Sequence, residues 1–262
     1  MVACDDLKLG GTLSSAGITG GLSINNTAIS VADWSTLFGS PGMSASVAEV
    51  YGRPGGYIAG DRLALSRVFS LDATIHKWPA NPANCTPSQQ ALMDNTDAFL
   101  AELAKPQGTF VEATFPDAST RFIHAYNIAP SPMIQPGSVR RFSVPMDAPW
   151  PYWMSGGTEK TDTLSGSDSL LVGGNAPLHN AVLSFAGDGS LSCPALGWTL
   201  TVAGSSAAVE VNLGTRKVVM SGSPAPNVLT RDRRDWAWFM PGANAVTATG
   251  TTITVTWRDN WL

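Results

Sequence analysis

Charge is what this chain has least of. Only 14% of its 262 residues are Asp, Glu, Lys or Arg, whereas a soluble domain averages roughly 25%. The 16 basic and 20 acidic residues leave a net charge of −4, which makes the chain a poor electrostatic partner for nucleic acid or for an anionic membrane. A hydrophobic share of 44% excludes a disordered chain. No apolar run reaches the ~18 residues of a transmembrane helix.

Cysteine is also scarce. Cys4, Cys85 and Cys193 are odd in number, far apart in the sequence, and not part of any C-x-x-C pair. This pattern encodes neither a disulfide framework nor a zinc site. The acidic start of the chain has no apolar segment of the kind found in secretory signals. We therefore expect three reduced thiols in a protein that folds in a cytoplasm.

The sequence lacks the motifs of the common catalytic and cofactor sites. G-x-S-x-G, H-E-x-x-H, G-x-x-x-x-G-K-[ST] and G-x-G-x-x-G are all absent. The three histidines, His76, His124 and His179, are scattered along the chain, and single histidines in strands are more often packed residues than metal ligands. We expect no catalytic residues, no metal and no cofactor.

One pair of carboxylates could suit a glycosidase. Asp232 and Asp235 lie within the segment RDRRD, residues 231–235. The three neighbouring arginines would keep both carboxylates ionised, which is wrong for a general acid. The segment is better interpreted as a solvated loop, so an enzyme such as a cell-wall hydrolase is the least favoured hypothesis.

What the chain does have is turn residues between short alternating runs. The 26 Gly and 18 Pro residues punctuate segments such as 198–202, 209–213 and 251–257, in which apolar and polar residues alternate with period 2. About seven such strands occupy the last ~85 residues, a spacing typical of a β-sandwich. Residues 181–192, with an Asp188-Gly189 turn, and residues 209–220 each predict a β-hairpin.

The segment Thr86–Lys105 is different and predicts a helix. Thr86 is a good N-cap, Pro87 suits the first helical position, and Gln89 would complete a capping box with Thr86. Pro106 then ends the helix. The apolar face at helical spacing consists of Leu92, Thr96, Phe99 and Leu103.

Composition suggests where one domain ends. Strand-like runs flank the helix on both sides, which indicates an α+β domain with one helix packed on a sheet or barrel. The rigid stretch APWPYW (residues 148–153) is followed by a Gly/Ser/Thr-rich segment. We predict a mainly β protein with an N-terminal domain over residues 1–153 and a C-terminal sandwich over residues 154–262.

Nine tryptophans raise the possibility of carbohydrate binding. Trp236 and Trp238 alternate in DWAWF, so both would point to one face of a strand. On an exposed face they could stack on sugar rings, whereas in the core they would contribute a large buried area. The core interpretation is favoured, and a carbohydrate-binding module or lectin acting through Trp236 and Trp238 is kept as the alternative function.

Several short motifs, in order, resemble siphovirus distal tail proteins, a family of phage minor tail proteins. They are GRPGGY and GDRL within residues 51–75, the helix Thr86–Lys105, FSVPMDAPWPYW (residues 142–153), VEVNLGTRKV (residues 209–218), WAWFMPGANAV (residues 236–246) and the C-terminal TTITVTWRDNWL. In the turn within residues 236–246, Pro241 fixes φ, Gly242 can adopt the positive φ of a type II turn, and Asn244 can hydrogen-bond locally. The first 50 residues match less clearly.

The resemblance implies a fold and a role. The N-terminal domain would be a split β-barrel or sheet with one helix that builds a hexameric ring, and the C-terminal domain would be a galectin-like β-sandwich outside the ring. The ring would join the tail tube to the tip or baseplate of the virion and would assemble in the cytoplasm of the bacterial host. Implied partners are other copies of the chain, the tail tube protein, the tape measure protein and the tail-tip hub proteins, with a host surface glycan as a further candidate.

Overall fold

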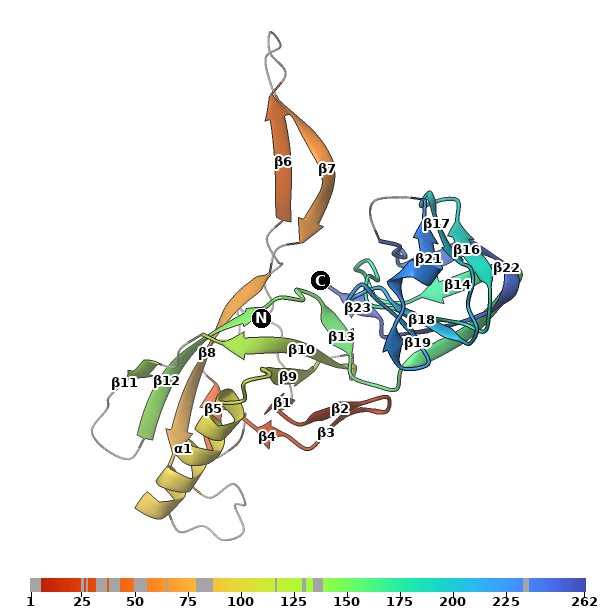
Figure 1. The fold of residues 1–262 in the computed structure, drawn as a ribbon. Coiled ribbons are helices and arrows are strands. Elements are labelled where there is room, and N and C mark those ends of the chain that lie inside the picture. Colours follow the sequence, from red (N-terminus) through yellow and green to blue (C-terminus); the bar gives the residue numbers. More distant parts are fainter. Residues whose placement is uncertain are drawn as a thin grey trace. The chain divides into compact units, whose positions relative to one another are not determined.

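The computed structural model describes residues 6–24, 26, 28–31, 37, 43–49, 56–64, 66–78, 87–115, 117–128, 131–133, 139–232 and 236–262. The chain divides into two compact units, one ending at Gly157 and the other covering Thr158–Trp261. Over the described residues the protein is mainly β, with a single α-helix (Figure 1), which confirms the predicted fold class.

The first unit consists of strands β1 (Asp6–Leu9), β2 (Thr12–Ser14), β3 (Gly17–Thr19), β4 (Leu22–Ser23), β5 (Ile29–Val31), β6 (Met43–Glu49), β7 (Gly56–Ala64), β8 (Arg67–His76), β9 (Thr109–Thr114), β10 (Thr120–Asn127), β11 (Ser131–Met133), β12 (Val139–Ala148) and β13 (Trp153–Ser155), with helix α1 (Gln89–Leu103). Its main sheet has the order β4-β1-β9-β10-β12-β8-β5. The hairpins β2–β3 and β6–β7 form separate two-stranded sheets.

The main sheet is curled, and Asn26 links its two end strands. β4 and β5 lie at opposite ends of the strand order but are neighbours in sequence. Between them, the Asn26 side-chain oxygen accepts hydrogen bonds from the N–H groups of Ala28 and Ile29, and its amide donates to the carbonyl of Ser23. This Asx turn stabilises the short connection between the two strands.

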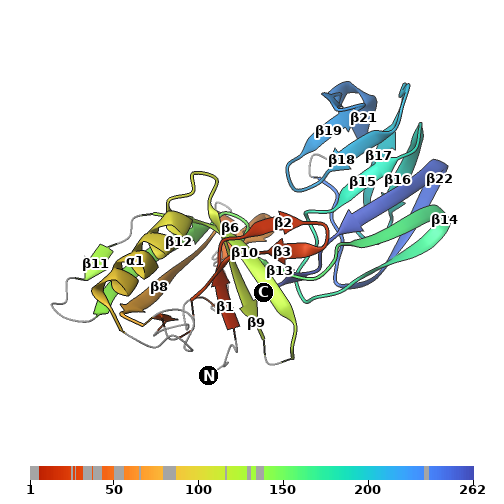
Figure 2. The ribbon, with the colours of Figure 1, turned by 90° about the horizontal axis from the view of Figure 1, so that it is seen from below.

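One face of the curled sheet is covered by α1, as Figure 2 shows. On β8 every second residue from Phe69 to Ile75 is buried, and the same alternation on β12 buries Phe142, Val144 and Met146. Helix residues Leu92, Thr96, Phe99 and Leu103 are the buried ones, as predicted. The Phe99 and Phe142 rings lie 5.9 Å apart between helix and sheet. This face is called the inner face below, and the opposite face the outer face.

The start of the helix differs from the prediction. The N-cap is Ser88, whose hydroxyl accepts a hydrogen bond from the N–H of Ala91 at 3.0 Å. The predicted capping box between Thr86 and Gln89 is therefore wrong, and Thr86 itself lies outside the described residues. Thr86 and Ser88 are both good N-cap residues, and the sequence alone does not rank them.

The second unit consists of strands β14 (Lys160–Val172), β15 (Val182–Phe185), β16 (Gly189–Cys193), β17 (Trp198–Val202), β18 (Val209–Asn212), β19 (Lys217–Met220), β20 (Ser223–Pro224), β21 (Leu229–Arg231), β22 (Gly242–Trp257) and β23 (Asn260–Trp261), with a short 3₁₀ turn, η2 (Pro226–Val228). The strand order is β20-β19-β18-β15-β22-β16-β17-β21, and β14 pairs with β22.

The long antiparallel strands β14 and β22 belong to both layers of this sandwich. The C-terminal part of β22 pairs with β15, and an earlier part pairs with β16. Between these parts the register with β14 shifts, so that residues 249–252 of β22 lie opposite one residue of β14. Gly250 has φ +81° there, and a Cβ on it would lie 2.9 Å from the carbonyl oxygen of Asp188. Glycine is therefore required at the bend.

This arrangement overturns one predicted hairpin and confirms the other. β15 and β16 are not paired with each other, because β22 runs between them and pairs with both. The Asp188-Gly189 turn therefore crosses between layers instead of closing a hairpin. β18 and β19 do pair as a hairpin, with Asn212 opposite Lys217.

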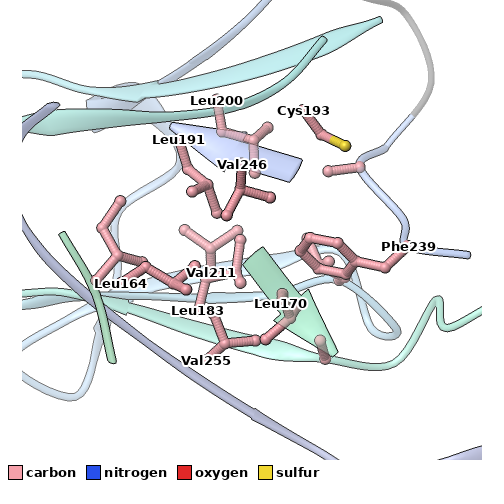
Figure 3. Close-up of a cluster of buried hydrophobic side chains, with 14 of the residues drawn as sticks. Leu164, Leu170, Leu183, Leu191, Cys193, Leu200, Val211, Phe239, Val246 and Val255 are labelled. Carbon is pink, nitrogen blue, oxygen red and sulfur yellow. The ribbon is translucent and has the colours of Figure 1, made fainter. Parts of the chain in front are cut away.

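The core of the second unit lies between its two layers. Figure 3 shows Leu191, Leu200 and Val246 from one layer pointing toward Leu183, Val211 and Val255 from the other. All six side chains are buried. Their alternation along each strand is the period-2 pattern seen in the sequence.

The outer edge of β14 is capped by its own side chains. Among the described strands of this unit, β14 pairs only with β22, so its other edge is unpaired. Asp162 accepts a hydrogen bond from the N–H of Thr163 at 2.9 Å, and Asp168 accepts one from the N–H of Ser169 at 2.8 Å. Two N–H groups of this edge are thus satisfied within the strand.

Asn244 stabilises the turn that leads into β22. Gly242 has φ +96°, as the predicted type II turn requires. The buried Asn244 side chain accepts from the N–H of Met240 at 2.9 Å and donates to the carbonyls of Met240, Gly242 and Leu170 at 2.8, 3.1 and 3.3 Å. The predicted local hydrogen bonding of Asn244 is confirmed.

Replacing Asn244 by Ala should destabilise the second unit by about 2–4 kcal/mol, because several buried backbone groups lose their partner. Urea unfolding of the full chain measures this. The control is Asn212→Ala, which removes one hydrogen bond to the N–H of Thr215 in an exposed turn and should cost less than about 1 kcal/mol. Equal losses in the two variants would contradict the role of Asn244.

Candidate functional surfaces

The structure does not bring the three histidines together. His76 ends β8 and lies 3.0 Å from the Ser30 hydroxyl through its Nε2. His124 lies on β10, opposite Phe110 on β9, with ring centroids 4.8 Å apart. His179 belongs to the second unit. No group of three or more potential His, Cys, Asp or Glu metal ligands occurs in the part of the chain that the structure describes.

Of the two carboxylates considered for catalysis, Asp232 has a structural role. Asp232 accepts a hydrogen bond from the N–H of Thr199 at 2.7 Å, which extends the pairing of β17 with β21 by one residue. Asp235 lies outside the described residues.

Of the three cysteines, Cys193 is buried in the sandwich core, where burial raises the pKa of its thiol. Cys4 and Cys85 lie outside the described residues.

Trp236 and Trp238 are neither fully buried in the core nor fully exposed on a strand face. Their neighbours Ala237 and Phe239 are the buried residues, with 1% and 0% exposure. Both tryptophans are partly buried and pack against the rim of the core. They do not lie in a strand, because only Phe239 in this segment forms a β-bridge, to Leu178. The alternation was predicted correctly, but the predicted strand and full core burial are wrong.

Each of the two tryptophans has a polar or charged neighbour. The His179 ring stacks on Trp238 with centroids 5.8 Å apart, and the Arg231 guanidinium lies 4.7 Å from the centre of the Trp236 ring. Trp198 donates a hydrogen bond from Nε1 to the Trp238 carbonyl at 2.9 Å. We call Trp236, Trp238, His179 and Arg231 the tryptophan surface.

Burial of His179 gives this surface a pH dependence. Desolvation, with a smaller contribution from Arg216, lowers the pKa of the His179 imidazole below its ordinary value of 6.5. The folded protein therefore holds His179 neutral at pH values where the unfolded chain already protonates it. The stabilising effect of the neutral ring is complete above pH 6.5 and is lost as pH falls below that value.

We expect the free energy of unfolding of the second unit to stay level above about pH 6.5 and to decrease as pH is lowered from there. His179→Gln should reduce this slope, because Gln does not titrate. Urea unfolding at several pH values measures the slope, and an NMR titration of the His179 ring gives its pKa directly. A ring pKa above 6.5 in the folded protein would contradict the prediction.

The outer face of the first unit carries a second candidate surface, which the sequence did not reveal. Val68, Tyr126 and Ile128 are exposed by 63%, 40% and 61%. They come from strand regions about 60 positions apart in the sequence, and only the register of the sheet brings them together. Alternation within β8 and β10 could have flagged each residue singly, but not the cluster.

The structure also contains no helix, within its described segments, that combines the length and hydropathy needed to cross a membrane.

Comparison with known proteins gives matches at the level of structure only. No protein-family model matches the chain, and no curated protein matches it. Among solved structures, the chain is similar to SPP1 Dit (gp 19.1), described as a paradigm of the hub adsorption apparatus in phages that infect Gram-positive bacteria. The TM-score is 0.63 at 14% identity, over 98% of this chain and 99% of that chain.

Chains of the phage P2 baseplate in its activated conformation also match, over 98% of this chain and 99% of theirs. The form with Ca has a TM-score of 0.49 at 7% identity, and the form with Sr has a TM-score of 0.49 at 6% identity. The match to SPP1 Dit shows that the chain has a fold found in a phage tail-hub protein. The match to SPP1 Dit extends through both units, so the two chains share a fold over their whole length.

Proposed function

We propose that the chain is a structural component of a bacteriophage tail tip: a ring-forming distal tail protein that joins the tail tube to the tip or baseplate. The observation that carries this proposal is the fold shared with SPP1 Dit over 98% of the chain. The short sequence motifs that resemble the distal tail family, in their order along the chain, support the proposal independently of the fold. In this proposal the chain is not an enzyme and uses no cofactor.

The proposed assembly is a homo-oligomeric ring, a hexamer, built by the N-terminal unit, with the C-terminal sandwich outside it. Its further partners are the tail tube protein, the tape measure protein and the tail-tip hub proteins. The protein would assemble in the cytoplasm of the bacterial host and reside in the virion. A charge content of 14% fits such a subunit, because the cores of obligate interfaces are depleted in charged residues.

Labelling of purified virions tests the role. Antibodies against the chain should decorate one end of the tail, at the tip, in negative-stain images. Light scattering on the purified chain at high concentration should give a mass several times that of the 27.4 kDa monomer. Absence of the chain from purified virions would overturn the proposal. A monomer in solution would not by itself do so, because rings of this kind can close on the tail.

A second candidate function is carbohydrate binding by the tryptophan surface. It is favoured by one observation: Ala237 and Phe239 fill the core in place of Trp236 and Trp238, which remain partly exposed. Partly exposed aromatic rings are the kind of side chain that can stack on sugar rings. The two functions are compatible, since a domain outside a tail ring can contact the host surface.

Trp236→Ala and Trp238→Ala should each weaken binding to host cell-wall glycans at least tenfold while the chain stays folded, if the tryptophan surface binds sugar. A glycan array and a host cell-wall pull-down measure binding, and thermal unfolding checks the fold. The control is Trp78→Ala, which removes an exposed tryptophan from the other unit and should leave binding unchanged. Unfolding of both tryptophan variants would instead show that the residues are structural.

A further inference from the structure

The β2–β3 hairpin of the first unit is joined to the main sheet by a pair of glycines on each strand. β1 pairs with β4 up to Leu9 and Leu22, and β2 pairs with β3 beyond them. Between the two ladders lie Gly10-Gly11 on one strand and Gly20-Gly21 on the other, all with φ between +76° and +94°. We call these four residues the glycine hinge. Figure 1 shows the hairpin extending from β1 and β4.

The glycine hinge is fixed at its base and open further out. The N–H of Gly10 donates a hydrogen bond to the carbonyl of Phe110 at 2.7 Å, so Gly10 is still held by the main sheet. A Cβ on Gly20, by contrast, would meet no other atom within 4 Å. Glycine adopts positive and negative φ about equally readily, so the backbone at Gly20 can change direction at low cost. Positions of this kind absorb the rotation of hinged segments.

Beyond the hinge, the hairpin is closed within itself and weakly attached to the rest of the unit. The Ser14 hydroxyl donates a hydrogen bond to the carbonyl of Gly17 at 3.0 Å across the turn. Among the described strands, β2 and β3 pair only with each other, and neither makes substantial contact with another helix or strand. All three residues of β2 are exposed. A two-stranded hairpin with so little buried surface belongs to the least stable parts of a fold.

The hairpin is held down at Gly17. Between Gly11 and Gly21 this is the one buried residue. It lies against the carbonyl of Gly156, because a Cβ on Gly17 would be 2.3 Å from that oxygen. On its other side, Gly156 donates a hydrogen bond from its N–H to the carbonyl of Thr120 on β10 at 2.7 Å, and a Cβ on Gly156 would be 2.9 Å from the same carbonyl oxygen. Gly156 is thus enclosed between two backbone segments, and both contacts require glycine.

This contact lies where the chain leaves the first unit. That unit ends at Gly157, and the second unit begins at Thr158. Two consecutive glycines leave the backbone with more conformational freedom than other residue pairs. The conformation of the chain at this exit therefore depends on the contacts that restrain Gly156.

We propose that the β2–β3 hairpin is a latch that holds the exit of the chain from the first unit. In the docked state Gly17 packs on the Gly156 carbonyl and fixes the backbone at Gly156 and Gly157. In the released state the hairpin turns on the glycine hinge with its own ladder intact, and the exit is free. Few interactions separate the two states, so the chain exchanges between them. This inference concerns the chain by itself and does not depend on the proposed function.

The first test removes the docked contact in two ways. Gly17→Ala places a Cβ against the Gly156 carbonyl. A second variant lacks residues 12–19 and joins Gly11 to Gly20, so that the glycine hinge becomes a four-residue loop between β1 and β4. In both variants hydrogen exchange of the Gly156 N–H, measured by NMR on the full chain, should be at least tenfold faster. Exchange of the Val111 N–H in the middle of β9 should stay as in the original protein.

The control for the first test is Gly166→Ala in the second unit. Gly166 has φ +65°, and a Cβ on it would meet no other atom within 4 Å. The substitution therefore introduces the strain of a side chain at positive φ without a clash, and exchange at Gly156 should not change. If either hairpin variant is folded and its Gly156 N–H exchanges at the original rate, the inference is overturned.

The second test follows the latch in the original protein. NMR relaxation dispersion reports motion on the μs–ms timescale. The amides of Leu13, Ile18 and Gly156 should show exchange at one common rate, and those of Leu7 and Leu9, which precede the hinge, should show none. A hairpin without such exchange, or exchange at Gly156 with a rate different from that of the hairpin, would show that the two do not move together and that the inference is wrong.

Discussion

The second unit depends on one long ladder, the pairing of β14 with β22. Each strand crosses the sandwich and contributes to both layers, and the register shift opposite residues 249–252 is where they bend from one layer to the other. The bend requires a residue that tolerates positive φ beside the Asp188 carbonyl, and Gly250 meets that requirement. The pairings of β15 and β16 follow from it, because each joins a different part of β22. The core between the layers is a consequence of this bend.

The first unit also encloses its core with a bent sheet, but in a different way. Its sheet is curled, the Asn26 turn stabilises the connection between the two end strands, and α1 covers the inner face. Both units thus bury one face of a bent sheet and leave the opposite face available. Exposed apolar side chains accordingly occur in both units, for example Val68 in the first and Leu171 in the second.

Local signals in the sequence predicted local structure well. The strand 198–202 and the helix face Leu92, Thr96, Phe99 and Leu103 were recognisable because their periods, two and 3.6, depend only on near neighbours. The predicted 181–192 hairpin failed because a strand more than fifty residues further on intervenes between its two arms. At Trp236 the alternation was visible, but not which side faces the core, since that depends on the bridge from Phe239 to Leu178. The cluster of Val68, Tyr126 and Ile128 depends on the register of three strands, which no single segment encodes.

The capped edge of β14 has a consequence for any assembly that holds several copies side by side. In a ring, the C-terminal sandwiches of neighbouring copies would be held close to one another. At such a high local concentration, even weakly favoured pairing between free strand edges would occur. Asp162 and Asp168 occupy two of the N–H groups that such pairing would use, and they add negative charge along the edge. The outer sandwiches of neighbouring subunits would thereby remain separate bodies, each able to move or to engage a target independently of the others.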